Sequence, residues 1–156
     1  MAKRKKPLYK TPATPREYLS WYWVYATRMS TRLLLRRRIP NEDELFFRVH
    51  RSYLRDGEII PGAFRDQGDH PILRGMSTDW NRYSTAEESR KRARSPEDNG
   101  IVSLEVARVR AISGLEVDHD PQWRNRAHSH VNGEKDAEAR LKLTRASRWV
   151  ISIPGE

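Results

Sequence analysis

The excess positive charge of this 156-residue chain is confined to its first forty residues. Residues 1–40 carry eleven Lys and Arg against a single acid, Glu17, for a net charge of +10. Residues 41–156 carry nineteen basic side chains against twenty acidic ones, for a net charge of −1. The sequence therefore predicts a basic N-terminal arm joined to a nearly neutral domain. A field of one sign attracts polyanions or an acidic partner surface.

Composition narrows the class of protein. The chain has no cysteine, which excludes disulfide scaffolds, Cys-ligated zinc and thiol catalysis. No apolar segment follows Lys3–Lys6 as a secretory signal requires, and Arg28 and Arg32 interrupt the most apolar stretch, residues 18–35. We therefore expect a cytoplasmic protein with no transmembrane segment and no bound cofactor or metal.

The arm divides into a tail and a helix. Residues 1–13 are polar and basic, which predicts a disordered tail. Thr14, Pro15 and Glu17 form a capping-box pattern that begins a helix, and Ile39-Pro40 ends it after about Arg38. The segment 14–40 interleaves cations with Trp and Tyr, which suits phosphates and stacked bases. The same pattern suits an anionic membrane surface, a protein partner, or packing of the aromatic rings on the protein's own core.

Residues 41–156 are predicted to form one α+β domain with a small, mostly antiparallel sheet. In residues 45–49 the apolar side chains alternate, with Leu45, Phe47 and Val49 on one side. Further strands are expected at residues 101–112, 115–117, 127–131 and 149–153, although residues 103–110 also fit a helix. Helices are expected to begin at Ser84–Glu87 and to span residues 134–147, with a turn at Asn132-Gly133. Residues 65–100 are predicted to be rich in loops, and residues 95–100 to form an exposed loop.

The residues best suited to chemistry lie between Val117 and Lys135. On a strand, His128 and His130 point to the same face. Such a pair can act as acid and base, or bind a divalent metal with Asp118, His119 or Asp120 as a third ligand. A hairpin over residues 115–131, with a loop of about eight residues, brings these groups together. The alternative is a structural pair of histidines.

A second candidate site combines Arg48 on the first strand with Ser77-Thr78. This pairing resembles ADP-ribosyltransferases, in which a basic residue and a serine hold NAD. The resemblance implies that Arg48 and Ser77 bind the cofactor. The third element of that family, a Glu near the end of a later strand, is not identifiable, although Glu105 and Glu116 are possible.

The C-terminal portion also resembles small bacterial proteins to which no established activity is attached. The resemblance rests on Asn125, Ala127, His128, Val131, Gly133 and Lys135, followed by the segment 137–146 and Trp149-Val150. An upstream Pro61-x-Ala63-Phe64 and Gly75-x-Ser77 extend it. It covers about two-thirds of the chain and implies that residues 45–153 are one fold.

We therefore expect a protein that associates with nucleic acid, RNA or DNA, or with a ribonucleoprotein. The competing class is an enzyme, either a nuclease-like hydrolase that uses His128 and His130 or an NAD-dependent transferase that uses Arg48 and Ser77. The predicted nucleic-acid contacts are Lys3, Arg4, Lys5, Lys6, Lys10, Arg28, Arg32, Arg36, Arg37 and Arg38.

Overall fold

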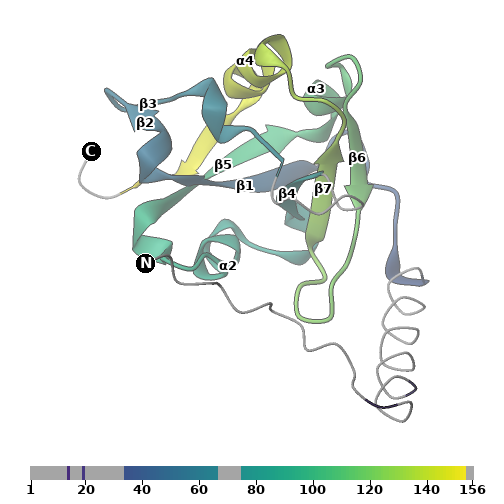
Figure 1. Ribbon diagram of the computed structural model, residues 1–156. Helices are drawn as coiled ribbons and strands as arrows, with labels where there is room; N and C mark the ends of the chain where they lie inside the picture. The colour runs from purple at the N-terminus through teal and green to yellow at the C-terminus, as the bar shows by residue number, and fades with distance from the viewer. Residues whose placement is uncertain (1–13, 15–18, 20–33, 67–74, 154–156) are drawn as a thin grey trace. The chain divides into compact units, whose positions relative to one another are not determined.

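The computed structural model describes Thr14, Leu19 and residues 34–66 and 75–153 (Figure 1). Residues 36–156 form one compact unit and residues 1–35 another. The predicted tail and most of the predicted helix at residues 14–38 lie outside the described residues. No helix among the residues described has the length and apolar character needed to cross a membrane.

An antiparallel sheet of six strands organises the unit that begins at Arg36. Its strand order is β6-β7-β4-β1-β5-β8, and every neighbouring pair is antiparallel. A separate two-stranded ribbon pairs β2 with β3. The predicted α+β class with an antiparallel sheet is therefore confirmed. The strands are β1 (Glu44–His50), β2 (Leu54–Arg55), β3 (Glu58–Ile59), β4 (Gly75–Trp80), β5 (Asn99–Glu105), β6 (Glu116–His119), β7 (His128–Asn132) and β8 (Arg148–Ile151).

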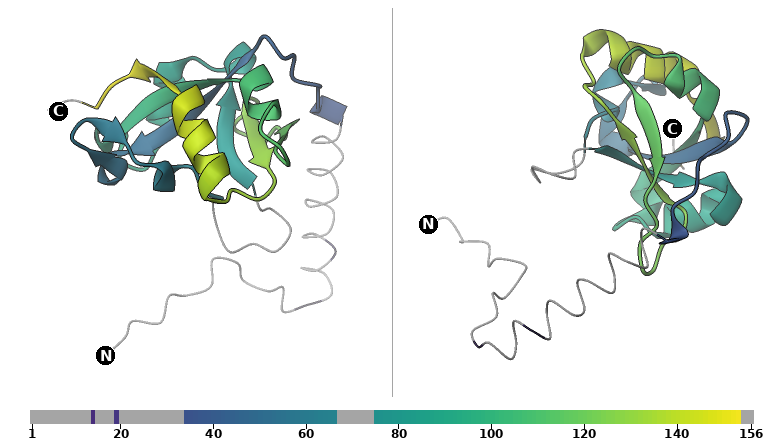
Figure 2. Two further views of the ribbon diagram at one scale, coloured as in Figure 1. Left: turned by 90° about the horizontal axis from the view of Figure 1, so that it is seen from above. Right: turned by 90° about the vertical axis from the view of Figure 1, so that its right-hand side faces the viewer.

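Among the described residues, three short α-helices lie against the sheet. Figures 1 and 2 show α3 (Val106–Arg110) and α4 (Ala137–Ala146) together on one side, and α2 (Ala86–Lys91) on the other. The predicted start of α2 is confirmed, because Thr85 and Glu88 form a reciprocal capping box. Four 3-10 turns join these elements: η1 (Arg51–Tyr53), η2 (Pro61–Ala63), η3 (Asn81–Tyr83) and η4 (Pro96–Asp98).

The hydrophobic core lies between the sheet and the layer of α3 and α4. As the alternation predicted, Leu45, Phe47 and Val49 of β1 are buried. The Phe47 ring stacks on Phe64 with centroids 5.2 Å apart, and Leu143 of α4 is fully buried in the same cluster. Leu141 of the same helix is exposed, because one face of a ten-residue helix is enough to cover this part of the sheet.

The opposite side of the sheet, which we call the polar face, carries Arg48, Ser77, Asp79, His128 and His130. Residues paired across antiparallel strands share a face. The pairs Phe46–Asp79, Asp79–His128 and Ser77–His130 therefore place these side chains together on the side away from the core. The sheet thus separates an apolar face that supplies stability from a polar face that holds the groups capable of chemistry.

The prediction of a loop-rich segment at residues 65–100 is wrong for β4. All six residues of this strand are buried, and it lies between β7 and β1. Its middle residues, Ser77, Thr78 and Asp79, are polar, so no apolar run marks it in the sequence. Their side chains are instead satisfied by hydrogen bonds from the neighbouring elements.

The predicted strand at residues 101–112 is a strand followed by a helix. The backbone N–H groups of Val106 and Ala107 donate to the carbonyls of Asp43 and Asn41, which ends the ladder, and α3 begins at Val106. Val106 and Val109, three residues apart, then face inward. Residues 95–100, expected to be an exposed loop, instead contain η4 and the first residues of β5.

The chain enters the domain through residues 36–40. These residues are not helical, so the helix that was predicted to run to about Arg38 ends earlier. The Arg37 backbone N–H donates to Nδ1 of His119 over 3.1 Å, and Ile39 is 1% exposed within the core cluster. Arg110 donates to the Ile39 carbonyl over 2.9 Å. The neutral domain therefore includes residues that the charge partition had assigned to the arm.

The turn predicted at Asn132-Gly133 has a backbone that only glycine tolerates. Gly133 has a φ of 102°, and a Cβ at this position would overlap the carbonyl oxygen of Gly114. We expect Gly133→Ala to lower the free energy of unfolding by about 2 kcal/mol or more. Urea denaturation measures this. The control is Gly62→Ala, whose Cβ would meet its nearest neighbour at 4.0 Å. Equal stability of the two variants would contradict this explanation.

Candidate functional site

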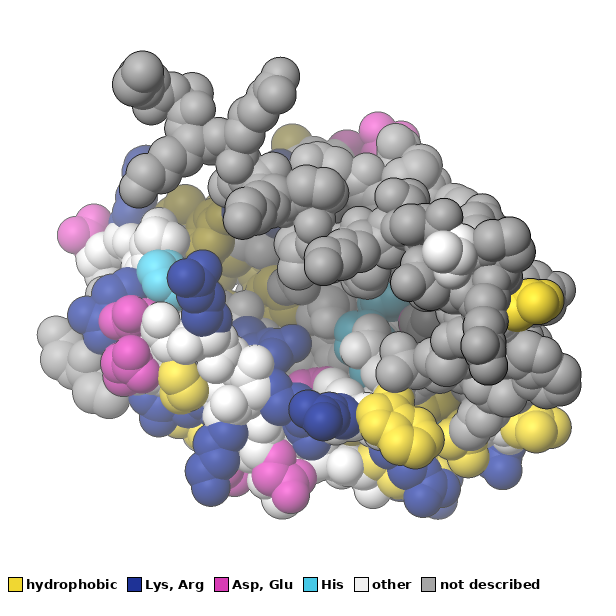
Figure 3. All heavy atoms as spheres, turned by 60° about the horizontal axis from the view of Figure 1, so that its bottom comes forward, with side chains coloured by type: hydrophobic (Ala, Val, Ile, Leu, Met, Phe, Trp, Pro, Cys, Tyr) yellow, Lys and Arg dark blue, Asp and Glu magenta, His cyan; other side chains and the backbone are white. Residues whose placement is uncertain are grey.

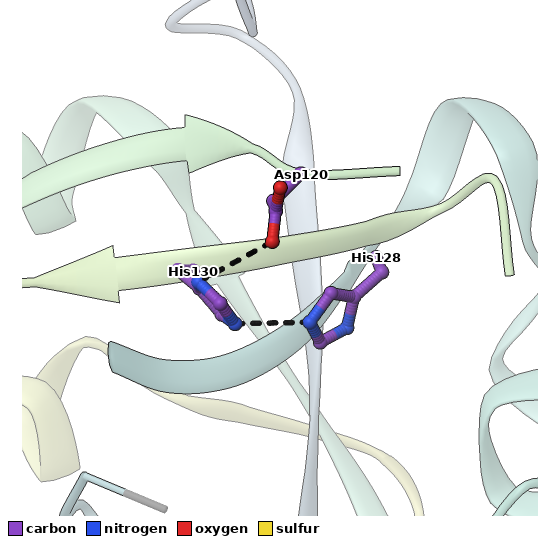
Figure 4. Close-up of side chains that lie close together, drawn as sticks. All are labelled: Asp120, His128 and His130. Carbon is purple, nitrogen blue, oxygen red and sulfur yellow. Dashed lines mark hydrogen bonds and ion pairs between the residues drawn. The ribbon is translucent and has the colours of Figure 1, made fainter. Parts of the chain in front are cut away.

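The predicted hairpin of β6 and β7 builds the main cluster. The two strands pair from Glu116–Asn132 to His119–Ser129, and residues 120–127 form the loop between them. The Asp120 backbone N–H donates to the His128 carbonyl over 2.9 Å, which closes the loop. Asp120, which follows β6, is thereby brought to the two histidines of β7. Ligand atoms of Asp120, His128 and His130 all lie within 4.8 Å of one another (Figure 4).

The two imidazoles share one face, as predicted, and they contact each other. The Nε2 atoms of His128 and His130 are 2.9 Å apart. Nδ1 of His128 lies 3.3 Å from the Ser77 hydroxyl, and Nδ1 of His130 lies 3.9 Å from Oδ2 of Asp120. The Asp120 side chain is 4% exposed and that of His130 is 15% exposed. The cluster is therefore recessed, with His130 as its more accessible member.

Two of these contacts, Ser77–His128 and His128–His130, are within hydrogen-bond distance, and the third, His130–Asp120, is a longer ion-pair contact. When the His130 Nδ1–H points to Asp120, its Nε2 accepts from the Nε2–H of His128. The Nδ1 of His128 then accepts from the Ser77 hydroxyl. Hydrogen bonds therefore join the two rings to each other and to Ser77.

Asp120 is oriented from outside the hairpin. Its Oδ1 accepts from the Arg36 guanidinium over 3.1 Å, and the Arg36 side chain is 52% exposed. Oδ2 of the same carboxylate faces His130. Because one oxygen is held by an arginine, the other has a defined direction toward the imidazole pair.

The expectation that His119 reaches the same place is wrong. His119 pairs with Ser129, one residue away from His130, and this shift of one places its ring on the core face. There it lies edge-on to Trp80 and stacks on Tyr83. Burial lowers the pKa of the His119 ring, against a smaller opposing effect of its hydrogen bond to the Arg126 carbonyl. The neutral ring then accepts from Arg37 and donates to Arg126.

Asp118 does not join the cluster either. It pairs with His130 in register, but its side chain is exposed and accepts from the Asn132 amide over 2.7 Å. Of the three candidates for a third ligand, the structure therefore brings only Asp120 to His128 and His130.

A second buried carboxylate, Asp79, connects the site to the rest of the domain. Asp79 is fully buried on β4 and accepts from Ser89 of α2 over 2.6 Å. It also accepts from Asn125 of the β6–β7 loop over 2.6 Å and from Arg92 over 3.4 Å. Asp79 carries no signal in the sequence, because its strand has no recognisable pattern. One carboxylate thus holds both the helix and the loop that border the histidines.

A cleft of about 750 Å³ opens beside β1. The paired residues of β1 and β4 are Leu45–Trp80 and Phe46–Asp79 alone, and the later part of β1 lines the cleft. The lining includes four guanidinium groups, and Asp66 carries the single carboxylate of the described lining. Asp66 is itself paired with the buried Lys135 over 2.7 Å. The four are Arg48, Arg65, Arg92 and Arg94, a set we call the arginine cleft.

Figure 3, which looks toward the α2 side of the sheet, shows Lys and Arg side chains in several groups on this face. Arg65 lies over the Tyr53 ring at 5.3 Å. Arg48 and Arg94 make no ion pair with any described residue. Among the described residues, Arg92 is the cleft arginine that pairs with a carboxylate, that of Asp79, and the other three guanidinium groups favour an anion.

Arg48 and Ser77, the candidate NAD-binding pair, lie on the same polar face but in different settings. Arg48 lines the arginine cleft, whereas Ser77 contacts His128. Within the described residues no hydrogen bond joins them. Glu105 pairs with Arg108 on the surface, and Glu116 is exposed at the start of β6.

The β6–β7 loop also presents an aromatic ring to solvent. Trp123 is 82% exposed, and its neighbour Arg124 is exposed as well. The guanidinium of Arg126 lies 4.2 Å from the centroid of Tyr83. The exposed tryptophan, which Arg124 follows directly, was not recognised as a candidate contact in the sequence, because residues 122–126 are otherwise polar.

No family model, no curated protein and no solved structure matches the chain. The resemblances to ADP-ribosyltransferases and to small bacterial proteins therefore stay expectations. Charge and geometry alone are the grounds on which a function can be proposed.

The role of Asp79 is open to a direct test. We expect Asp79→Ala to lower the free energy of unfolding by about 3–5 kcal/mol, because Ser89, Asn125 and Arg92 lose their common partner. Urea denaturation measures the change. The control is Asp118→Ala, which removes one exposed hydrogen bond and should cost about 1 kcal/mol or less. Similar losses in both variants would show that Asp79 does not hold these segments.

Proposed function

We propose that this protein binds nucleic acid through its basic segment, residues 3–38, with further contacts from the domain. The observation that carries the proposal is the charge partition, +10 in residues 1–40 against −1 in residues 41–156. Phosphate contacts by Lys and Arg supply most of the affinity of non-specific binding, because they release condensed counterions. A basic arm on a neutral domain concentrates that attraction in one segment.

Two features of the domain support the same partner. Trp123 offers an exposed aromatic face beside Arg124, and bases of single strands stack on such rings whatever their sequence. The arginine cleft adds guanidinium groups that match phosphate geometry. Asp79 connects the two, since it binds Asn125 of the Trp123 loop and Arg92 of the cleft. Together they favour a single-stranded nucleic acid over a duplex or an acidic protein.

The enzymatic alternatives have less support. An acid and a base that act on opposite sides of a phosphate must stand apart, whereas Nε2 of His128 and Nε2 of His130 are 2.9 Å apart. A nuclease reaction here would use the pair as a single base. The NAD-dependent alternative lacks an interaction between Arg48 and Ser77 among the described contacts.

The arm is tested by removing charge from the full chain. Substitution is preferred to truncation at this boundary, because Ile39 belongs to the core. We expect replacement of Lys3, Lys5, Lys6 and Lys10 by Gln to weaken binding of a labelled single strand of about 16 nucleotides. The slope of log K against log salt should fall by up to about 3, at about 0.7 per phosphate contact. Fluorescence anisotropy across a salt series, with RNA and DNA of one sequence, measures both.

The matched control removes the same charge from the domain. Arg55, Arg108, Lys142 and Arg145 are exposed, and their replacement by Gln lowers the net charge equally. The salt slope of this variant should stay close to that of the original protein. If both variants lose the same affinity and slope, net charge alone governs binding and the arm has no special role.

Trp123 is tested separately. We expect Trp123→Ala to weaken single-strand binding by about 1–3 kcal/mol, the usual contribution of one stacked base. Thermal stability should not change, because the side chain is 82% exposed. Trp149→Ala, an exposed tryptophan on β8, is the control and should leave the affinity unchanged. Unaltered binding by the Trp123 variant would remove the loop from the proposed interface.

A further inference from the structure

We propose that Asp120, His128 and His130 form a binding site for a first-row divalent transition metal, with Zn²⁺ as the best match. The inference does not depend on nucleic-acid binding. The proposed ligand is a cation, which the positively charged basic arm and arginine cleft do not attract.

The donor set selects this class of cation. Two imidazoles and one carboxylate are a ligand combination typical of zinc sites that keep a fourth position open for water or substrate. Mg²⁺ and Ca²⁺ prefer oxygen donors and several waters, which two imidazole nitrogens do not supply. Two nitrogen donors within the group therefore favour Zn²⁺ over the hard cations.

The separations fit a common centre. Zinc–ligand distances of about 2.0–2.1 Å place tetrahedral ligand atoms about 3.3 Å from one another. One ligand atom from each of the three residues lies within 4.8 Å of the others, and the two Nε2 atoms are 2.9 Å apart. The proposed site requires rotation of the two rings and of the carboxylate to bring all three donors to bonding distance.

The contact between the rings shows that their donor atoms converge. In the neutral pair one Nε2 carries a proton and the other accepts it. A cation that replaces this proton would face both nitrogens at once. Metal binding then releases the proton, as is usual when imidazoles become ligands.

Other groups hold the ligands in place. The Ser77 hydroxyl lies 3.3 Å from Nδ1 of His128, so this ring can donate its remaining N–H there when Nε2 binds a metal. Arg36 holds Oδ1 of Asp120 at 3.1 Å and directs Oδ2 toward His130. The backbone hydrogen bond from Asp120 to His128 fixes the distance between two ligands. Such supporting contacts are a regular part of metal sites.

Accessibility also favours an ion over a large substrate. The side chains of Asp120 and His130 are 4% and 15% exposed, so little of the cluster is accessible from solvent. An ion with its water molecules needs less space than a nucleotide. The described lining of the arginine cleft does not include these three residues, which separates the two sites.

The test is titration of the metal-free, full-length protein with Zn²⁺ in competition with a chromogenic chelator. We expect one equivalent to bind. His130→Gln and Asp120→Asn should each weaken binding by on the order of 100-fold, since loss of a supporting group alone costs 10–100-fold. The control is His50→Gln, which removes an exposed imidazole that bonds to Ser52, outside the cluster. This variant should bind Zn²⁺ like the original protein.

If one variant folds poorly, the effect of Zn²⁺ on the thermal unfolding temperature provides a second measurement of binding. Zn²⁺ should raise the Tm of the original protein and of His50→Gln, because it binds the folded state, and should leave the Tm of His130→Gln unchanged. Absence of a bound equivalent in the original protein, equal affinity in His130→Gln, or equal affinity for Mg²⁺ would each overturn the proposal. The histidines would then be a structural pair.

Discussion

The arrangement of this domain depends on a carboxylate buried in the middle of its sheet. Asp79 has no exposed surface, and a buried charge is tolerated only when its oxygens are well hydrogen-bonded. Its partners come from two separate segments: α2 with the arginine that caps it, and the β6–β7 loop. The hydrogen bonds to this one carboxylate therefore hold in place the segments that border the polar face. The loop so fixed is the one that delivers Asp120 to the histidines.

The two faces of the sheet have different roles: one stabilises the fold and the other positions polar side chains. Alternate residues of β1 and the apolar faces of α3 and α4 bury the hydrophobic core, and this burial supplies most of the stabilisation. The polar face carries side chains that are hydrogen-bonded to one another. They contribute little hydrophobic stabilisation to the fold, but their hydrogen bonds hold one another in position. The two histidines of the candidate site are positioned by a strand and Asp120 by the loop before it, whereas the charge of the basic segment needs no fixed geometry to attract phosphates.

Sequence patterns predicted the parts of this fold in which apolar and polar side chains alternate along a strand. They identified β1, the β6–β7 hairpin and the shared face of His128 and His130, because each follows from a period of two. They failed for β4, whose polar residues are satisfied only by tertiary contacts. The choice between His119 and Asp120 also required the pairing register, since a shift of one residue reverses the face. The arginine cleft joins residues from distant segments, and no local pattern marks it.

The burial of Ile39 has a consequence for how the basic segment can be separated from the domain. A protease that cleaves after Arg38 would create a new positively charged amino group on a residue that is 1% exposed. The same cut would remove Arg36, which holds Asp120, and Arg37, which binds His119. Limited proteolysis after Arg38 would therefore leave a domain of lower stability. Cleavage upstream of Arg36 would leave a domain that keeps both of these contacts. The charge partition places the end of the basic segment at Pro40, whereas the packed domain already begins at Arg36.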